Sequence, residues 1–120
     1  VDTTNPTVTI TSDQPGTADD ADNTILYTFT FSETVSDFVA DDISLSAGTK
    51  GAFTETVTGT TWTLLVTVPD DSTTSITADV AASVATDSNA NANVVATQTT
   101  QVVDTTNPTV TITSDQPGTA

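Results

Sequence analysis

Residues 24–32 read TILYTFTFS, a stretch in which large apolar side chains occupy every second position. The positions from Ile25 to Phe31 that share one face carry isoleucine, tyrosine and phenylalanine. A period of two is that of a β-strand, because successive side chains of a strand point to opposite sides of the sheet. Residues 61–68 (TWTLLVTV) have the same period, with Trp62 in phase with a leucine and two valines. Both stretches therefore predict strands that bury one face.

The rest of the chain has the same preference for strands. Threonine supplies 31 of the 120 residues and valine is the leading apolar type, and both are β-branched residues that favour strands. No segment has a sustained helical period. We predict seven strands, over residues 7–12, 24–32, 43–47, 53–57, 61–68, 74–82 and 94–102. Seven short strands in a chain of this length predict an all-β fold, an Ig-like antiparallel β-sandwich of Greek-key type.

The inward positions of these strands predict the buried core. It consists of Val8, Ile10, Tyr27, Phe29, Phe31, Ile43, Leu45, Val57, Trp62, Leu64, Val66, Ile76, Val80 and Val95. This core is thin for a domain of this size, so we expect marginal intrinsic stability and a further source of stabilisation.

Composition excludes several kinds of chemistry. The chain has no Cys, His or Met, so neither thiolate nor imidazole sites nor disulfides can form. One Lys+Arg stands against 16 Asp+Glu, which gives a net charge of −15 and predicts repulsion from nucleic acid and anionic membranes. Paired carboxylates could in principle hydrolyse glycosides, but no arginine or aromatic platform accompanies any pair. We therefore expect no enzyme.

The first and last 18 residues of the chain are identical. Residues 1–18 and residues 103–120 both read VDTTNPTVTITSDQPGTA, at an offset of 103 − 1 = 102 residues. An identical segment of this length indicates a tandem repeat. We assign residues 1–102 to one complete Ig-like repeat and residues 103–120 to the linker and first strand of the next. The linker VDTTNP is short, contains proline and lacks glycine, which predicts a stiff spacer.

The acidic residues concentrate in loops. Fourteen of the 16, all but Glu55 and Asp79, lie outside the predicted strands. A β-sandwich sorts its loops to two ends, which we name the first pole (the N-terminal end) and the second pole (the exit to the next repeat). The first pole is predicted to gather Asp2, Glu33, Asp41, Asp42 and Asp87. The second pole is predicted to gather Asp19, Asp20, Asp22, Asp70, Asp71 and Asp104. In a tandem array, the second pole of one copy would face the first pole of the next.

Crowded carboxylates repel one another, and a bound cation would relieve the repulsion. With only oxygen ligands available the cation is hard, and Ca²⁺ suits irregular loops better than Mg²⁺. The spacing Asp87-x-Asn89-x-Asn91 resembles the start of a calcium loop, although it lacks the glycine and distal glutamate of an EF-hand. We predict several Ca²⁺ ions, bound by the acids of both poles and Asn89, with Asp104 at the junction. The alternative is a purely solvating role, which predicts acids at the outward strand positions; those are mostly threonine.

Three motifs carry a family resemblance. Residues 31–43 read FSETVSDFVADDI, residues 85–91 read ATDSNAN, and the linker reads VDTTNPT. Together they resemble the bacterial Ig-like extender repeats of large calcium-dependent RTX adhesins, a group that includes ice-binding (antifreeze) adhesins. The last loop of that family usually contains a glycine, which residues 85–91 lack. The resemblance implies an extracellular rod on the bacterial cell surface, secreted by a type I system and stiffened by Ca²⁺ at its junctions.

A structural extender that holds a separate ligand-binding region away from the cell is therefore the expected function. The alternative is a binding module for sugar, protein or ice within the same adhesin. A twisted sandwich interrupted by Glu55 offers no long flat threonine array for ice, and Trp62 is in phase with the core rather than exposed to a sugar. The expected partners are neighbouring identical repeats of the same chain, with no nucleic acid, no direct membrane contact and no small-molecule substrate.

Overall fold

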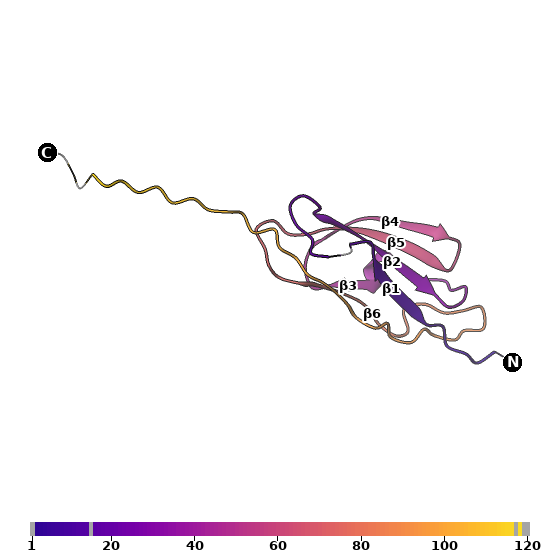
Figure 1. The fold of residues 1–120 in the computed structure, drawn as a ribbon. Helices are drawn as coiled ribbons and strands as arrows, with labels where there is room; N and C mark the ends of the chain where they lie inside the picture. The colour runs from indigo at the N-terminus through magenta and orange to yellow at the C-terminus, as the bar shows by residue number, and fades with distance from the viewer. Residues whose placement is uncertain (1, 15, 117, 119–120) are drawn as a thin grey trace.

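The computed structural model describes residues 2–14, 16–116 and 118, which form strands and loops with one short 3₁₀ turn (Figure 1). The strands are β1 (Val8–Ser12), β2 (Thr24–Phe31), β3 (Ile43–Leu45), β4 (Thr49–Val57), β5 (Thr61–Thr67), β6 (Ile76–Val80) and β7 (Thr99–Gln101). The 3₁₀ turn η1 (Ala40–Asp42) precedes β3. Each of the seven predicted strands is present, although several begin or end at other residues.

The strands form two antiparallel sheets. One sheet has the strand order β1-β2-β5-β4 and the other has the order β3-β6-β7. This is the arrangement of a constant-type immunoglobulin fold, in which the first, second, fifth and fourth strands face the third, sixth and seventh. In the register of β2 against β5, Tyr27 lies opposite Leu64 and Phe29 lies opposite Trp62, so the two alternating stretches bury the same side. The predicted antiparallel sandwich is confirmed.

Aromatic side chains form the centre of the core. Tyr27 and Phe29 are fully buried, and Trp62 is only 6% exposed, which confirms its predicted place in the core. Phe38 packs its ring edge-on against Phe31 and Trp62, with ring centroids 5.0 and 5.2 Å apart. Phe38 belongs to the connection between β2 and η1, where strand alternation does not apply, so the alternation could not predict it.

Two residues predicted in the core face solvent. Val57 is 54% exposed because β4 is an edge strand whose pairing with β5 is irregular between Glu55 and Val57, which shifts the phase of the alternation. Val95 is 65% exposed, and the neighbouring Ala96 is buried in its place. Leu45, also predicted in the core, is only partly buried at its edge.

The strand predicted over residues 94–102 shortens to β7. Upstream of β7 the backbone leaves the regular ladder, because the amide of Val94 donates to the carbonyl of Pro6 at 2.9 Å and that of Ala96 donates to Val80 at 3.0 Å. These two amides are thus directed to different segments of the fold. This segment therefore runs beside the linker and β6 and lacks the two-residue period of a strand. The loss of that period explains why Val95 is exposed.

The segment after β7 leaves the sandwich. Figure 1 shows it (yellow) extending from the end opposite the N-terminus, and the molecule measures 92 × 22 × 21 Å along its principal axes. Residues 106–114 contain no strand, and Val110 and Ile112 are 85% and 89% exposed. Within the described residues, no helix has the length and apolar character needed to cross a membrane.

Candidate metal centre

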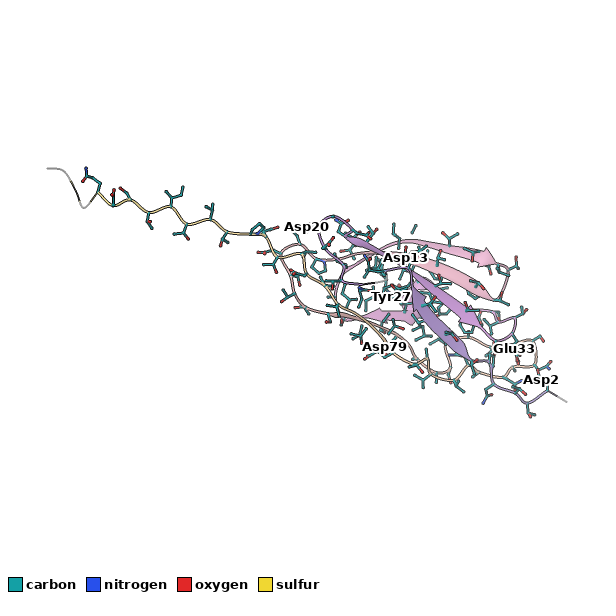
Figure 2. All side chains as sticks on the ribbon, viewed as in Figure 1. Asp2, Asp13, Asp20, Tyr27, Glu33 and Asp79 are labelled. Atoms are coloured by element: carbon teal, nitrogen blue, oxygen red, sulfur yellow. The ribbon has the colours of Figure 1, made fainter. Side chains whose placement is uncertain are left out.

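Three carboxylates meet at the first pole. Asp2, Glu33 and Asp87 each offer one oxygen, and these three oxygens all lie within 4.8 Å of one another. The residues come from the linker before β1, the loop after β2 and the loop between β6 and β7. Figure 2 shows Asp2 and Glu33 at the same end of the sandwich, away from Asp20. The topology therefore brings together three of the five acids predicted for this pole.

The loop that carries Asp87 is organised around its carboxylate. Oδ1 of Asp87 accepts the amides of Asn89 and Asn91 at 2.8 and 2.9 Å, and Oδ2 accepts the side-chain amide of Asn91 at 2.9 Å. Ala90 adopts a positive φ of 67°, which closes the loop so that the Asp87 amide reaches the Asn91 carbonyl at 3.0 Å. Short polar side chains favour such turns because they hydrogen-bond the nearby backbone. Asp87 is 7% exposed, and its orientation is thus set by its own loop.

The same loop holds the linker. The side-chain amide of Asn89 donates to Oδ2 of Asp2 at 3.2 Å, and that of Asn91 donates to the Asp2 carbonyl at 3.0 Å. Oδ1 of Asp2 accepts the amide of Thr4 at 2.9 Å, an Asx-turn that stiffens the linker. Asn89 was a predicted ligand and lies beside the cluster, whereas Asn91 was not among the predicted ligands. The Asp-x-Asn-x-Asn spacing was the sequence signal that pointed to it.

Proximity of the carboxylates changes their acidity. A hydrogen bond with Asp87 is the main reason why the pKa of Glu33 rises to about 7, and partial burial and the charges of Asp87 and Asp2 add to the effect. The pKa of Asp87 falls well below its usual value because Glu33 and Asn91 hydrogen-bond its ionised form. In the absence of a cation, Glu33 therefore keeps its proton up to a pH near 7. A hard cation would compete for the same oxygens, which are the ligand type that Ca²⁺ prefers.

The other two acids predicted for the first pole lie apart from this cluster. Asp41 and Asp42 belong to η1, where Oδ2 of Asp42 accepts the amide of Val39 at 2.9 Å. Nζ of Lys50 donates to the carbonyls of Ala40 and Ile43 at 2.8 and 2.5 Å. The single lysine of the chain therefore holds this turn against β4, although the residue as a whole is exposed.

At the second pole, the described residues form no group of three carboxylates. Oδ1 of Asp19 accepts the amides of Ala21 and Asp22, both at 3.0 Å, and closes its own turn. Asp20 and Asp70 are exposed. The acids predicted to gather at this pole are Asp19, Asp20, Asp22, Asp70, Asp71 and Asp104, and within the described residues no three of them bring their oxygens together as Asp2, Glu33 and Asp87 do.

The second copy of the linker is held by the second pole through backbone amides and the Thr105 hydroxyl. Thr105 is 2% exposed, and its hydroxyl donates to the carbonyl of Pro69 at 2.6 Å. The Asp104 amide donates to Ala18 at 2.7 Å, and the Asn107 amide donates to Oδ1 of Asp71 at 3.0 Å. Asp104 also repeats the Asx-turn of the first copy, with the amide of Thr106 at 3.2 Å from its Oδ1. Both linker copies thus have the same local turn.

The two linker copies show two sets of contacts that use different atoms. The first copy contacts the sandwich that follows it, through the Asp2 carboxylate, the Asp2 carbonyl and the buried Pro6. The second copy contacts the sandwich that precedes it, through the Asp104 amide and through the amide, carbonyl and hydroxyl of Thr105. At the offset of 102 residues, Asp104 corresponds to Asp2 and Thr105 to Thr3. The two sets have no atom of the linker in common.

A comparison with protein families gives one match, to a family described as bacterial Ig-like domain, over residues 2–103. The match begins in the first linker and ends just after β7, at the start of the second linker. No curated protein and no solved structure matches the chain.

Proposed function

The chain belongs to the bacterial Ig-like domain family, and from that premise we propose that it is a structural extender repeat of a large calcium-dependent surface adhesin. A domain of this family is consistent with a structural module of a surface protein. In this proposal the repeat projects a separate ligand-binding region away from the cell, as in the RTX and ice-binding adhesins that its motifs resemble. It carries out no catalysis, and its partners are identical repeats of the same chain.

The double anchorage of the linker is the observation that carries the proposal. Thr105 is buried against the sandwich before the linker, and Pro6 is buried against the sandwich after it. A flexible tether would leave a glycine-rich, solvated segment between domains. Here one copy of the six-residue linker is bound to the sandwich after it and the other copy to the sandwich before it, which supports a repeat that keeps a fixed orientation to its neighbour.

Calcium would complete this junction. In an array, Asp104 would take the place that Asp2 has in this repeat, and its carboxylate would join Glu33 and Asp87 of the following copy. Ca²⁺ bound there would connect the linker to two loops of the next sandwich and would displace the proton that Glu33 holds. The ion would also offset part of the net charge of −15.

Thermal unfolding tests the calcium step. A site that is saturated at about 100 times its Kd adds about 2.7 kcal/mol, which corresponds to roughly 10–20 °C for a domain of this size. The melting temperature should therefore rise by that amount between EDTA and excess Ca²⁺. Glu33→Gln should lose most of the rise, because glutamine mimics the protonated residue without the ligand charge.

Asp37→Asn is the matched control for that variant. It removes one carboxylate from the same connection, at an exposed position outside the cluster, and asparagine tolerates its positive φ of 73°. The control should respond to Ca²⁺ as the original chain does. An original chain whose melting temperature is the same in EDTA and Ca²⁺ would refute the calcium step, and an equal loss in both variants would refute the assigned site.

A further inference from the structure

The larger sheet, β1-β2-β5-β4, has an outward side without charged residues in its ladders. Side chains of a strand alternate, so the neighbours of each buried residue in β1, β2 and β5 point away from the core. Every outward position in the ladders of the four strands carries threonine, leucine or valine. These side chains form rows across the sheet. We name this outward side the threonine face, centred on the row of Thr11, Thr28, Thr63 and Thr54.

Charged side chains lie at the edge of the threonine face or away from it. Lys50 and Glu55, the two charged residues of β4, pair with buried residues of β5 and therefore belong to the inward phase. Asp13 follows β1 at one corner of the face, where its Oδ1 accepts the amide of Leu26 at 2.8 Å. The smaller sheet differs, because its outward side carries Asp79 in β6. Of the two sheets, only the larger one thus presents an uncharged ladder to solvent.

The hydroxyl groups of the threonine face are available to a partner. Among the described residues, the only hydrogen bond made by a hydroxyl of its ladder threonines joins Thr61 to Thr60, at 3.5 Å. A hydroxyl both donates and accepts, so one row of threonines is complementary to another row of the same kind. Leu26 lies opposite Leu65, which is 37% exposed, and this pair adds apolar area to the face.

Charge selects a second copy of this chain as the partner. A chain with a net charge of −15 repels another copy wherever their carboxylates face each other, and Lys50 already binds two carbonyls of its own fold. At the threonine face two copies can touch without placing like charges in contact. A charged partner would lose hydration there and find no opposite charge. The face of a second copy offers the matching hydroxyl rows and no charge.

We propose that the threonine face binds the threonine face of a second copy of this chain. A contact that uses the same surface on both partners has two-fold symmetry and closes as a dimer. Figure 1 shows the N-terminal end and the exit segment at opposite ends of the sandwich, so repeats joined end to end leave this lateral face uncovered. The contact joins neighbouring chains side by side, which goes beyond an extender function that joins repeats within one chain.

The size of the threonine face makes this contact weak and reversible. Four strands about 4.8 Å apart, with outward rows about 7 Å apart, form a surface of roughly 15–20 Å in each direction. Two such surfaces bury roughly 600–800 Å² in total, below the 1,200 Å² or so of a stable complex. We therefore expect monomers at micromolar concentration and association at protein concentrations on the order of 1 mM.

Sedimentation equilibrium of the full chain in EDTA tests the association. The mass should rise from 12.3 kDa towards twice that value as the concentration increases. Association should be stronger at about 1 M than at about 0.1 M NaCl, because salt shortens the range of the repulsion from about 10 Å to about 3 Å. Monomers at every concentration, or a contact that salt weakens, would overturn the proposal. Because no Ca²⁺ is present, this failure is distinct from a failure of the calcium site.

A charged variant locates the contact on the threonine face. Thr63→Asp places a carboxylate at the centre of the face, where it meets the same carboxylate of the second copy, and should raise the dissociation constant about tenfold or more. Thr100→Asp is the matched control, because Thr100 is exposed in β7 of the smaller sheet and the two variants have equal net charge. The control should associate like the original chain. If the two variants associate equally, the contact lies elsewhere and the proposal is wrong.

Opposite charges at one position test whether the two faces meet. An equimolar mixture of Thr63→Asp and Thr63→Lys chains should associate at least tenfold more tightly than Thr63→Asp alone, because unlike charges replace like charges across the contact. A mixture of Thr63→Asp and Thr100→Lys has the same charges but only one of them on the threonine face, and it is the control. Circular dichroism melts confirm that each variant is folded. Equal association of the two mixtures would contradict a face-to-face contact.

Discussion

Glu33 links protonation to stability at the level of a single side chain. Its pKa in the folded chain is about 7, above the ordinary value of 4.5, so the folded chain holds an extra proton between these two values. The stabilisation that this extra proton gives the folded chain is complete below about pH 4.5 and disappears as the pH rises through 7. The contribution of Asp87 to stability has the opposite pH dependence. Because the pKa of Asp87 is lowered in the folded chain, its stabilisation is lost as the pH falls below the ordinary value of 3.8.

We therefore predict that, in EDTA, the melting temperature rises when the pH is lowered from 8 to 5.5 and falls again in stronger acid. Acidification also relieves the general repulsion of a chain with a net charge of −15, so the comparison with Glu33→Gln isolates the pair. That variant has no proton to gain at this position and should show a clearly smaller rise. Circular dichroism melts across the pH range measure both chains, and identical pH profiles would contradict the assignment to Glu33.

At the residue scale, the loop topology of a sandwich was sufficient to predict that Asp2, Glu33 and Asp87 share one pole. It was not sufficient for Asp41 and Asp42, because the connection that carries them also buries Val35 and Phe38 and ends in a 3₁₀ turn. That path depends on tertiary packing and not on any local pattern. At the second pole the described carboxylates form no such group of three, and two of them accept backbone amides instead: Asp19 within its own turn, and Asp71 from Asn107 of the linker.

At the scale of the elements, the alternation of apolar and polar residues predicted each strand. It did not predict which side chains of β4 and of the segment before β7 point inward. β4 pairs with β5 through two register shifts, and each shift reverses which side chains point inward. The segment before β7 donates its amides to Pro6 and Val80 and so has no strand period. A sequence pattern records an average period, whereas a bulge or a bend depends on neighbouring segments that are distant in sequence.

The single lysine makes a contact between elements. Lys50 lies in β4 of one sheet, and its ammonium group binds the carbonyls of Ala40, the first residue of η1, and Ile43, the first residue of β3 in the other sheet. Hydrogen bonds from a charged donor are worth about 1.5–3 kcal/mol when shielded, and less at an exposed position. We predict that Lys50→Met lowers the free energy of unfolding by about 1–2 kcal/mol in urea titration.

The loss of Lys50, the only basic residue, also makes the net charge more negative. A second variant controls for this change in charge. Lys50→Met combined with Thr54→Lys restores the charge at an exposed position of the same strand but leaves the carbonyls of Ala40 and Ile43 without the ammonium group. The double variant should remain destabilised. Recovery of the original stability would show that Lys50 acts through net charge and not through this contact.

For the whole molecule, the proposed extender function requires that the linker set how one repeat is oriented relative to the next. Its amides and the Thr105 hydroxyl are bound to the sandwich before it, and the carboxylate and proline of the other copy are bound to the sandwich after it. Each hydrogen bond contributes only about 1 kcal/mol, but together they hold nearly every residue of a six-residue spacer. If one linker makes both sets of contacts, few backbone torsions remain free to act as a hinge, and the proposed stiffness would come from the shortness of the linker as well as from the contacts.

The stiffness can be measured by small-angle scattering of a chain with two complete repeats. With Ca²⁺ we predict a maximum dimension close to that of two sandwiches end to end, and a shorter, broader distribution of distances in EDTA. Thr105→Val should loosen the junction even with Ca²⁺, because valine keeps the shape of threonine but loses the hydrogen bond to Pro69. Thr106→Val, at the exposed neighbouring position, should leave the distribution unchanged. If the original chain is as flexible with Ca²⁺ as in EDTA, and no stiffer than Thr105→Val, the linker is a passive tether and the extender function is wrong.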